Sequence, residues 1–165
     1  MKDVLDFAQY ICDRYHSITD DPIDEMKLHK LLYFCQREKL AILNEPMFTE
    51  HMQGWVHGPV SLRTRTYFDS TDGIIQLATN DISDEDKYII NNVLEQYAGL
   101  ASWKLRDLSH EEYSWQHSRE GLAPDERGSK GLLLDDIRHD AKKVRPIDSV
   151  WGMYYDEFED FEVAE

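Results

Sequence analysis

The sequence is poor in cysteine: Cys12 and Cys35 alone, among 165 residues, are too few for a disulfide scaffold. It also lacks any uncharged stretch approaching the roughly 18 residues that a transmembrane helix needs. No apolar stretch follows Met1, Lys2 and Asp3, so we expect no secretory signal peptide. These absences predict a protein of the reducing cytoplasm.

Basic residues are scarce relative to acidic ones: 18 Lys and Arg against 33 Asp and Glu give a formal net charge of −15. Such a chain lacks the cationic surface needed to displace counterions from nucleic acid or to bind anionic lipid. We therefore expect no direct nucleic-acid partner and no membrane partner. The charge is compatible with a cationic protein partner, with mimicry of nucleic acid, or with solubility alone.

Apolar residues recur at helical spacing through most of the chain, which predicts a compact, single-domain, mostly α fold of about six to seven helices. Turn and capping residues separate the periodic segments. Asp21 and Pro22 suit the start of the second helix, Ser83 that of the fourth, and Asp135 or Asp136 that of the last. The predicted helices span about 2–16, 22–44, 59–68, 84–98, 101–108, 112–119 and 135–143.

A small β element is predicted near residues 47–57, as a short extended pair. Gly58-Pro59-Val60 is interpreted as a sharp turn that feeds the third helix. On the second helix, the leucines are expected to face the core, and the basic residues are expected to form its polar side. Those basic residues are Lys27, Lys30, Arg37 and Lys39.

The last fifteen residues differ from the rest because they hold six acidic residues and no base. Tyr154, Phe158 and Phe161 follow i, i+4, i+7 spacing, with Trp151 and Tyr155 close by, so a helix here would have an aromatic face and an acidic back. Three interpretations stay open: packing on the chain's own domain, docking into a partner's hydrophobic groove with a basic rim, or an acidic disordered tail.

No motif with the spacing of a known catalytic, nucleotide-binding or metal-binding site is present. His110 and His117 lie seven residues apart with Glu111 nearby, but no third ligand stands at a specific spacing. We therefore expect no enzyme activity, no cofactor and no metal. A metal-dependent hydrolase that uses these three residues is the remote alternative.

Three segments of the chain form a pattern. They are Lys27-Leu28-His29-Lys30-Leu31-Leu32-Tyr33-Phe34, Gly54-Trp55-Val56-His57-Gly58-Pro59-Val60, and the stretch from Leu105 through Ser109-His110-Glu111 to Trp115 and Arg119. Together they resemble the signature of the Panacea domain, the family of SocA-like antitoxins and phage-associated GepA-type proteins. The resemblance covers about residues 1–145, and residues 146–165 form an acidic aromatic extension outside it.

The resemblance implies a mostly helical domain with a small β element and a role without catalysis. Members of the family neutralise a co-encoded toxin by direct binding, and at least one kind delivers its toxin to a cytosolic protease. We therefore predict an antitoxin of a bacterial or prophage toxin–antitoxin system, with occlusion of a cationic toxin active site as one mechanism. The alternative is an adaptor that delivers a toxin or another client to an ATP-dependent protease.

The motif residues divide into two predicted roles. A structural role is expected for one set, with Trp55 packed against its leucines: Leu28, Lys30, Leu31, Leu32, Gly58, Pro59 and Val60. A partner-binding role is expected for side chains of aromatic and amphipathic chemistry, which suit interaction hot spots. This second set is Tyr33, Trp55, His57, Arg63, His110 and Trp115, together with the tail residues Trp151, Tyr154, Tyr155, Phe158 and Phe161.

Overall fold

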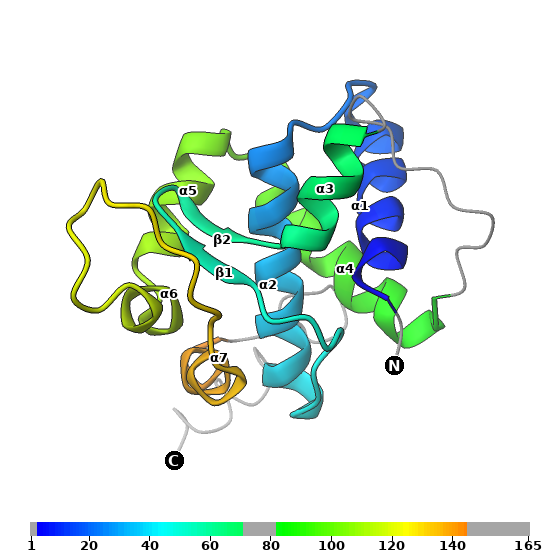
Figure 1. The fold of residues 1–165 in the computed structure, drawn as a ribbon. Coiled ribbons are helices and arrows are strands. Elements are labelled where there is room, and N and C mark those ends of the chain that lie inside the picture. Colours follow the sequence, from blue (N-terminus) through cyan, green and yellow to red (C-terminus); the bar gives the residue numbers. More distant parts are fainter. Residues whose placement is uncertain (1–2, 71–81, 145–165) are drawn as a thin grey trace, which may run out of the picture.

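The computed structural model describes residues 3–70 and 82–144. In these ranges the chain is mostly helical with one small antiparallel sheet, as the sequence predicts (Figure 1). No helix in these ranges is long and apolar enough to span a membrane. The elements are α1 (Val4–Thr19), α2 (Glu25–Leu43), β1 (Gln53–Trp55), β2 (Gly58–Val60), α3 (Leu62–Ser70), α4 (Asp84–Tyr97), α5 (Ser102–His110), α6 (Tyr113–Ser118) and α7 (Leu134–Ala141).

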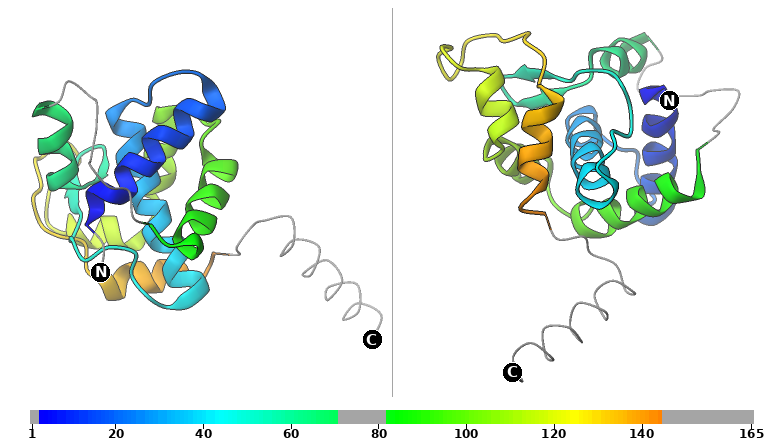
Figure 2. Two further views of the ribbon diagram at one scale, coloured as in Figure 1. Left: turned by 90° about the vertical axis from the view of Figure 1, so that its right-hand side faces the viewer. Right: turned by 90° about the horizontal axis from the view of Figure 1, so that it is seen from below.

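Helix α2 is the centre of the fold, because α1, α3, α4, α5, α7 and β2 all pack against it (Figures 1 and 2). Every residue from Lys27 to Leu40 is buried as a result. Leu28, Leu31 and Leu32 lie in the same apolar cluster as Phe7 of α1. An α-helix that is enclosed on all sides cannot keep a solvated polar face.

The expected polar side of α2 is therefore wrong. Its four basic residues are between 1% and 9% exposed, and Glu38 beside them is only 2% exposed. Burial raises the pKa of the Glu38 carboxyl to about 7, because loss of water disfavours its charged form. The basic residues in question are Lys27, Lys30, Arg37 and Lys39.

The buried basic residues of α2 are paired with elements far along the chain. Lys27 Nζ donates to the carbonyl of Ala98 at 3.1 Å, and Lys39 Nζ lies 2.7 Å from a carboxylate oxygen of Asp86 at the start of α4. Arg37 forms an ion pair with Glu112, just before α6. A buried charge without such a partner costs several kcal/mol, so these contacts fix where the neighbouring elements can lie.

The start of α2 lies later than predicted. Asp24, not Asp21, is its N-cap, and the Asp24 side chain accepts a hydrogen bond from the amide of Lys27 at 2.8 Å. Helix α1 also continues to Thr19, into the segment predicted as a turn, and ends at Asp20 in a left-handed conformation with φ of 61°. The two shifts cancel, so the connection between α1 and α2 keeps its predicted length but lies three residues later in the sequence.

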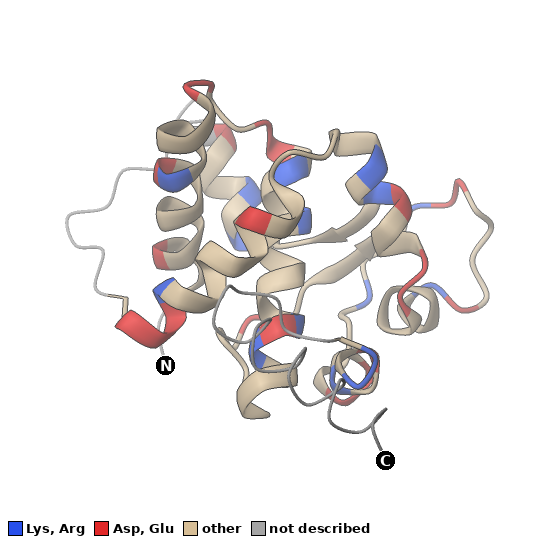
Figure 3. Ribbon diagram, turned by 180° about the vertical axis from the view of Figure 1, so that it is seen from behind, with Lys and Arg blue, Asp and Glu red and all other residues tan. Residues whose placement is uncertain are grey.

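The predicted N-cap of α4 is confirmed, whereas the predicted N-cap of α7 is wrong. Ser83 caps α4 as predicted, accepting from the amide of Asp86 at 3.1 Å, and acidic residues fill the first turn (Figure 3). Helix α7 begins at Leu134 without a side-chain cap. Asp135 and Asp136, predicted as its cap, lie instead in the first turn, where the helix dipole favours negative charge.

The β element is a hairpin that includes residues predicted as a turn. Gln53 pairs with Val60 and Trp55 with Gly58, so the element runs from 53 to 60 rather than over 47–57. The turn falls at residues 56 and 57, and α3 begins only at Leu62. The interpretation of Gly58-Pro59-Val60 as the start of a helix is therefore wrong.

Gly58 occupies a position that requires glycine on two counts. Its φ is +114°, a conformation that side chains rarely adopt. A Cβ there would lie 2.5 Å from Cε of Lys30 and 2.6 Å from Oγ of Ser109. The neighbouring Pro59 carbonyl accepts the hydrogen bond of Lys30 Nζ at 3.2 Å, so β2 lies directly on the lysine stem.

Gly58→Ala tests this close packing. We expect it to lower the free energy of unfolding by about 2–4 kcal/mol, because strained backbone and overpacking each cost on the order of 1–3 kcal/mol. Gly99→Ala is the matched control, since a Cβ at Gly99 meets nothing within 4 Å. Urea unfolding of both variants measures the difference, and equal midpoints for the two would contradict the packing described here.

Candidate partner-binding surface

The turn of the hairpin lies at one end of the molecule, beside α5, α6 and the loop over residues 121–131 (Figures 1 and 2). Strand β2 contacts α5, and β1 contacts α6. The end of the loop pairs with the other edge of β1, because Gly131 forms a bridge with Gln53 and the amide of Gly54 donates to the carbonyl of Lys130 at 3.0 Å. Four separate parts of the sequence therefore meet at the hairpin.

Aromatic rings from three elements gather here. The ring of His110, at the end of α5, stacks on Trp115 of α6 with centroids 4.0 Å apart and planes 5° from parallel. Trp115 Nε1 donates to the backbone carbonyl of Trp55 at 2.8 Å. The guanidinium of Arg65 lies over the Trp55 ring at 5.4 Å, and that of Arg119 over Trp115 at 5.6 Å. The hairpin is thus fastened to α6 by its aromatic residues.

Arg119 fixes the loop against the hairpin from inside. It is only 6% exposed and donates to the carbonyls of Gly54 at 3.0 Å, Ala123 at 3.2 Å and Glu126 at 2.5 Å. A guanidinium with several donors suits this bridging of separate backbone segments. The loop that flanks the hairpin is therefore held in place by one buried side chain.

A hollow of about 410 Å³ opens between the hairpin turn and the loop. Its lining combines the indole of Trp55 with the side chain of Val56, and Arg127 carries its only formal charge. A concave apolar surface with one cation suits an apolar side chain that stands next to a carboxylate. The lining residues are Gln53, Trp55, Val56, His57, Arg127, Gly128 and Ser129.

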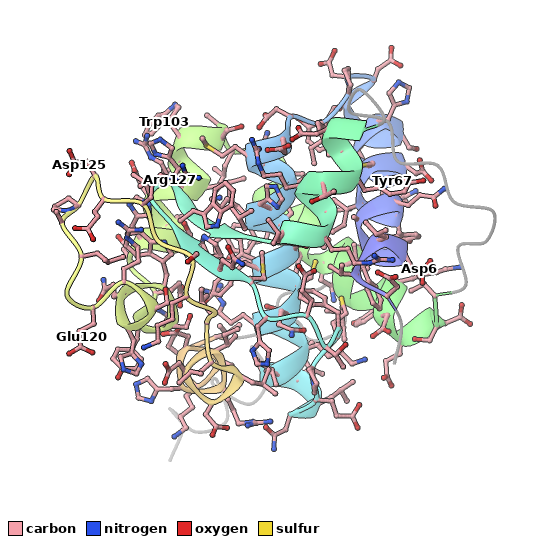
Figure 4. All side chains as sticks on the ribbon, in the orientation of Figure 1. Asp6, Tyr67, Trp103, Glu120, Asp125 and Arg127 are labelled. Atoms are coloured by element: carbon pink, nitrogen blue, oxygen red, sulfur yellow. The ribbon has the colours of Figure 1, made fainter. Side chains whose placement is uncertain are left out.

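Trp103 extends the surface along α5 and was not singled out from the sequence. It is 60% exposed, and it stands seven residues before His110, so the two share one face of the helix. Figure 4 shows Trp103 and Arg127 at the same end of the molecule. Amphipathic spacing marks a position as outward-facing but does not reveal that a tryptophan there stays uncovered. We call the surface formed by Trp55, His57, Trp103, His110, Trp115 and Arg127 the hairpin surface.

Two basic groups at the hairpin surface and beneath it, Lys30 and His110, have lowered pKa values. Burial lowers the pKa of the Lys30 ammonium to about 7, because the group has lost its water. The pKa of His110 is also lowered, first by burial and then by the positive charges of Arg106 and Lys30. His110 Nε2 is buried without a hydrogen-bond partner. Neutral imidazole is therefore the favoured form of this residue, which suits its stacking on an aromatic ring.

Two of the predicted partner-binding residues lie elsewhere. Tyr33 is fully buried, and its hydroxyl contacts Ser114 Oγ at 2.8 Å and a carboxylate oxygen of Asp140 at 3.2 Å, so it joins α2 to α6 and α7 and is not available to a partner. Arg63 is exposed on α3 but binds the carboxylate of Asp3, the N-cap of α1, with its Nε at 2.8 Å. The tail residues Trp151, Tyr154, Tyr155, Phe158 and Phe161 lie outside the described residues.

Trp55 is not packed against the leucines of α2 as expected. It belongs neither to the buried core nor to the partly buried residues around it, and its indole Nε1 donates to Gln53 Oε1 at 2.9 Å. Its ring is partly exposed and lies against Arg65 instead. Trp55 is therefore a residue of the surface and not of the core.

The histidines do not assemble with acidic residues into a metal centre in the described part of the chain. Within residues 3–70 and 82–144, no group of three or more His, Cys, Asp or Glu side chains is placed to hold a metal ion. His117 Nδ1 lies 2.6 Å from a carboxylate oxygen of Asp136, whereas His110 stacks on Trp115. The two histidines that the sequence suggested as joint ligands thus have separate contacts.

Comparison with known protein families gives a match over more than half of the chain. A family described as "Antitoxin SocA-like, Panacea domain" matches residues 28–116. This range begins in α2 and ends in α6, so it contains all of the hairpin surface except Arg127. No curated protein and no solved structure matches the chain.

The buried Lys30 predicts a pH dependence of stability. Its pKa is about 7 in the folded chain against 10.5 for an ordinary lysine, so between these values the unfolded chain holds more protons and stability rises with pH. We expect the wild type to gain stability relative to Lys30→Met from about pH 7 to about pH 9.5, by at most about 1.4 kcal/mol per pH unit.

Urea unfolding across this pH range measures the difference between the two proteins. Lys104→Met, which removes an exposed lysine of α5, is the control and should keep a constant offset from the wild type. A constant offset for Lys30→Met as well would show that Lys30 has an ordinary pKa.

Proposed function

Since the chain belongs to the family of SocA-like antitoxins with a Panacea domain, we propose that it neutralises a toxin protein by binding it directly through the hairpin surface. The observation that carries the proposal is the exposed aromatic surface around the hairpin, most of which lies within the residues that match the family. We infer that the protein acts in the cytoplasm of a bacterium or prophage host, without catalysis.

The hairpin surface has the composition of an interaction hot spot. Tryptophan and arginine are enriched at the centres of protein interfaces, where a pocket receives an anchor from the partner. Trp103 supplies an exposed indole, and the hollow beside His57 supplies a pocket. The supporting contacts of Trp115 and Arg119 hold the hairpin side of this pocket in a fixed position, which reduces the entropy lost on binding.

The charge of the chain favours a toxin with a cationic surface. A net charge of −15 attracts such a partner over a distance and raises the association rate, and salt weakens the attraction. Many toxins that act on nucleic acid require cationic active sites, so occlusion of the active site is the mechanism that we propose. The tail from Trp151 to Glu165, with its six acidic residues and its aromatic residues, is the proposed second contact.

Trp103→Ala should weaken binding to the toxin at least tenfold, which corresponds to about 1.4 kcal/mol, without a change in the free energy of unfolding. Ile18→Ala is the control, because Ile18 is 54% exposed on α1, away from the hairpin. Calorimetric titration of purified toxin into each variant gives the dissociation constants. Equal constants for both variants and the wild type would remove the hairpin surface from the proposal.

Deletion of residues 151–165 should weaken neutralisation and reduce the salt dependence of toxin binding, because it removes six negative charges and the aromatic side chains. Growth rescue and pull-down at low and high salt measure both effects. A matched variant that keeps the aromatic residues and replaces the six acids by amides separates the two contributions. Full rescue and unchanged binding by the truncated chain would show that the tail plays no part.

The same pull-down separates occlusion from delivery to a protease. Occlusion leaves the toxin level unchanged or raised, and recovers a stoichiometric complex. An adaptor would lower the toxin level, would require the protease for rescue, and would bring a protease subunit into the eluate. This second outcome would replace the proposed mechanism.

A further inference from the structure

Two hollows flank Lys143, at the end of α7. The first, of about 430 Å³, is lined by the apolar surfaces of Phe34, Tyr97 and Leu108. The rings of Phe34 and Tyr97 stack with centroids 4.5 Å apart beneath this hollow, where they are 1% and 8% exposed. Val144, the last residue that the structure describes, lies in the rim of this hollow, so the chain beyond it leaves from this point.

The second hollow, of about 460 Å³, lies on the other side of Lys143 and includes Tyr113 and His139. Tyr113 is 45% exposed, and its ring lies edge-on to His139 at 5.6 Å. Aromatic side chains therefore line both hollows: those of the first come from α2 and α4, and those of the second from α6 and α7. We call these two hollows together the α7 surface.

The charges of the α7 surface differ from those of the whole chain. Glu112 is paired with the buried Arg37, and Asp140 accepts hydrogen bonds from the backbone amides of Tyr113 and Ser114 at 2.9 and 2.8 Å. Glu112 is thus offset by a positive charge, and the Asp140 carboxylate, although still charged, is buried and directed at backbone amides within the fold.

The exposed charges that remain are two bases and one acid. Lys143 reaches Glu112 Oε2 at 3.1 Å but keeps 53% of its side chain exposed. Lys142 is exposed beside it, and Glu111 is the one opposing acid of the lining. Figure 3 shows both basic and acidic positions on α7. The linings of the two hollows hold three bases and three acids in all, but bases outnumber acids among the exposed residues, unlike in the whole chain of net charge −15.

We propose that the acidic aromatic tail of this same chain, residues 151–165, docks on the α7 surface. Trp151 follows Val144 by seven residues, a span of up to about 24 Å when extended, so its side chain can reach either hollow. The tether gives the tail an effective local concentration on the order of millimolar, so modest contacts suffice to hold it. Its aromatic residues match the aromatic lining of the hollows, and its acids match Lys142 and Lys143.

The docked tail covers a surface that would otherwise be exposed. It stays bound to the folded domain until a cationic partner that binds it more tightly displaces it. Binding to the body and binding to a toxin use the same aromatic and acidic side chains, so the two states compete. Release of the tail is then part of toxin recognition, and the free energy of self-docking is subtracted from the tail's contribution to toxin affinity.

Limited chymotrypsin digestion of the full-length chain tests the docking, because the tail holds the cleavable residues Tyr154, Tyr155 and Phe158. We expect the tail of Lys142→Glu/Lys143→Glu to be cut at least about fivefold faster than that of the wild type at low salt, since charge reversal repels it. Lys104→Glu/Lys130→Glu is the control, because it changes the net charge equally through two exposed lysines outside the α7 surface.

A second variant leaves the folded body untouched. Replacement of Asp156, Glu157, Glu159 and Asp160 by their amides should give the same faster cleavage as the lysine variant. High salt should speed cleavage of the wild type and change that of the two variants little. Equal cleavage of the wild type and both variants would overturn the proposal.

Dilution separates docking within one chain from docking between two. Protection of a tail that binds its own body is unchanged over about a hundredfold range of protein concentration, because the contact is intramolecular. Loss of protection on dilution would make a second copy of the chain the occupant and would overturn the proposal. No toxin is present in these measurements, so a negative result leaves the proposed antitoxin function standing.

Discussion

The structure depends on the enclosure of one charged helix. Helix α2 would be an ordinary amphipathic helix by its sequence, yet its neighbours cover the charged side as well as the leucines. Each ion taken from water there costs several kcal/mol unless a partner is supplied. Lys39 is paired with α4 and Arg37 with the residue before α6, whereas Lys30, whose pKa burial lowers to about 7, donates to a backbone carbonyl of the hairpin. These pairings leave the surrounding elements few alternative positions, and so the polar contacts specify the arrangement that the apolar contacts stabilise.

This arrangement separates the residues that identify the family from those that face solvent. Lys30 and Gly58 touch each other beneath the hairpin, and Tyr33 is hydrogen-bonded among α6 and α7, so much of the motif encodes the framework. The groups available to a partner are the side chains that this framework holds outward, such as Trp103 and His57. A domain built in this way can keep its interior constant while its exposed residues differ, which is the requirement for recognising different partners on one fold.

Apolar periodicity and capping chemistry were sufficient to predict the helical class and most helices, with the Ser83 cap as the sharpest example. They failed where a tertiary contact decides the outcome. Glycine and proline together favour a turn, yet residues Gly58–Val60 form a strand. They do so because β1 pairs with them and because Lys30 Nζ donates a hydrogen bond to the carbonyl of Pro59. The bases of α2 looked solvated because their partners, such as Asp86 and Glu112, lie more than 45 residues away in the sequence. The exposure of Trp103 likewise depends on tertiary packing, because it is set by which other elements of the fold lie over α5.

The distribution of charge joins the fold to the proposed function. Within residues 3–70 and 82–144, the buried lysine, arginine, aspartate and glutamate residues are five bases and four acids, so this interior is close to neutral: Lys27, Lys30, Arg37, Lys39 and Arg119, against Glu38, Asp86, Glu112 and Asp140. The net charge of −15 therefore comes from residues outside this buried set, and a net charge of this size acts on association rather than on the choice of fold. The hairpin surface contributes little to that charge, because Arg127 is its one fixed ion. In the proposed function, long-range attraction raises the rate at which a cationic toxin associates, and the aromatic contacts at the hairpin lower the rate at which it dissociates.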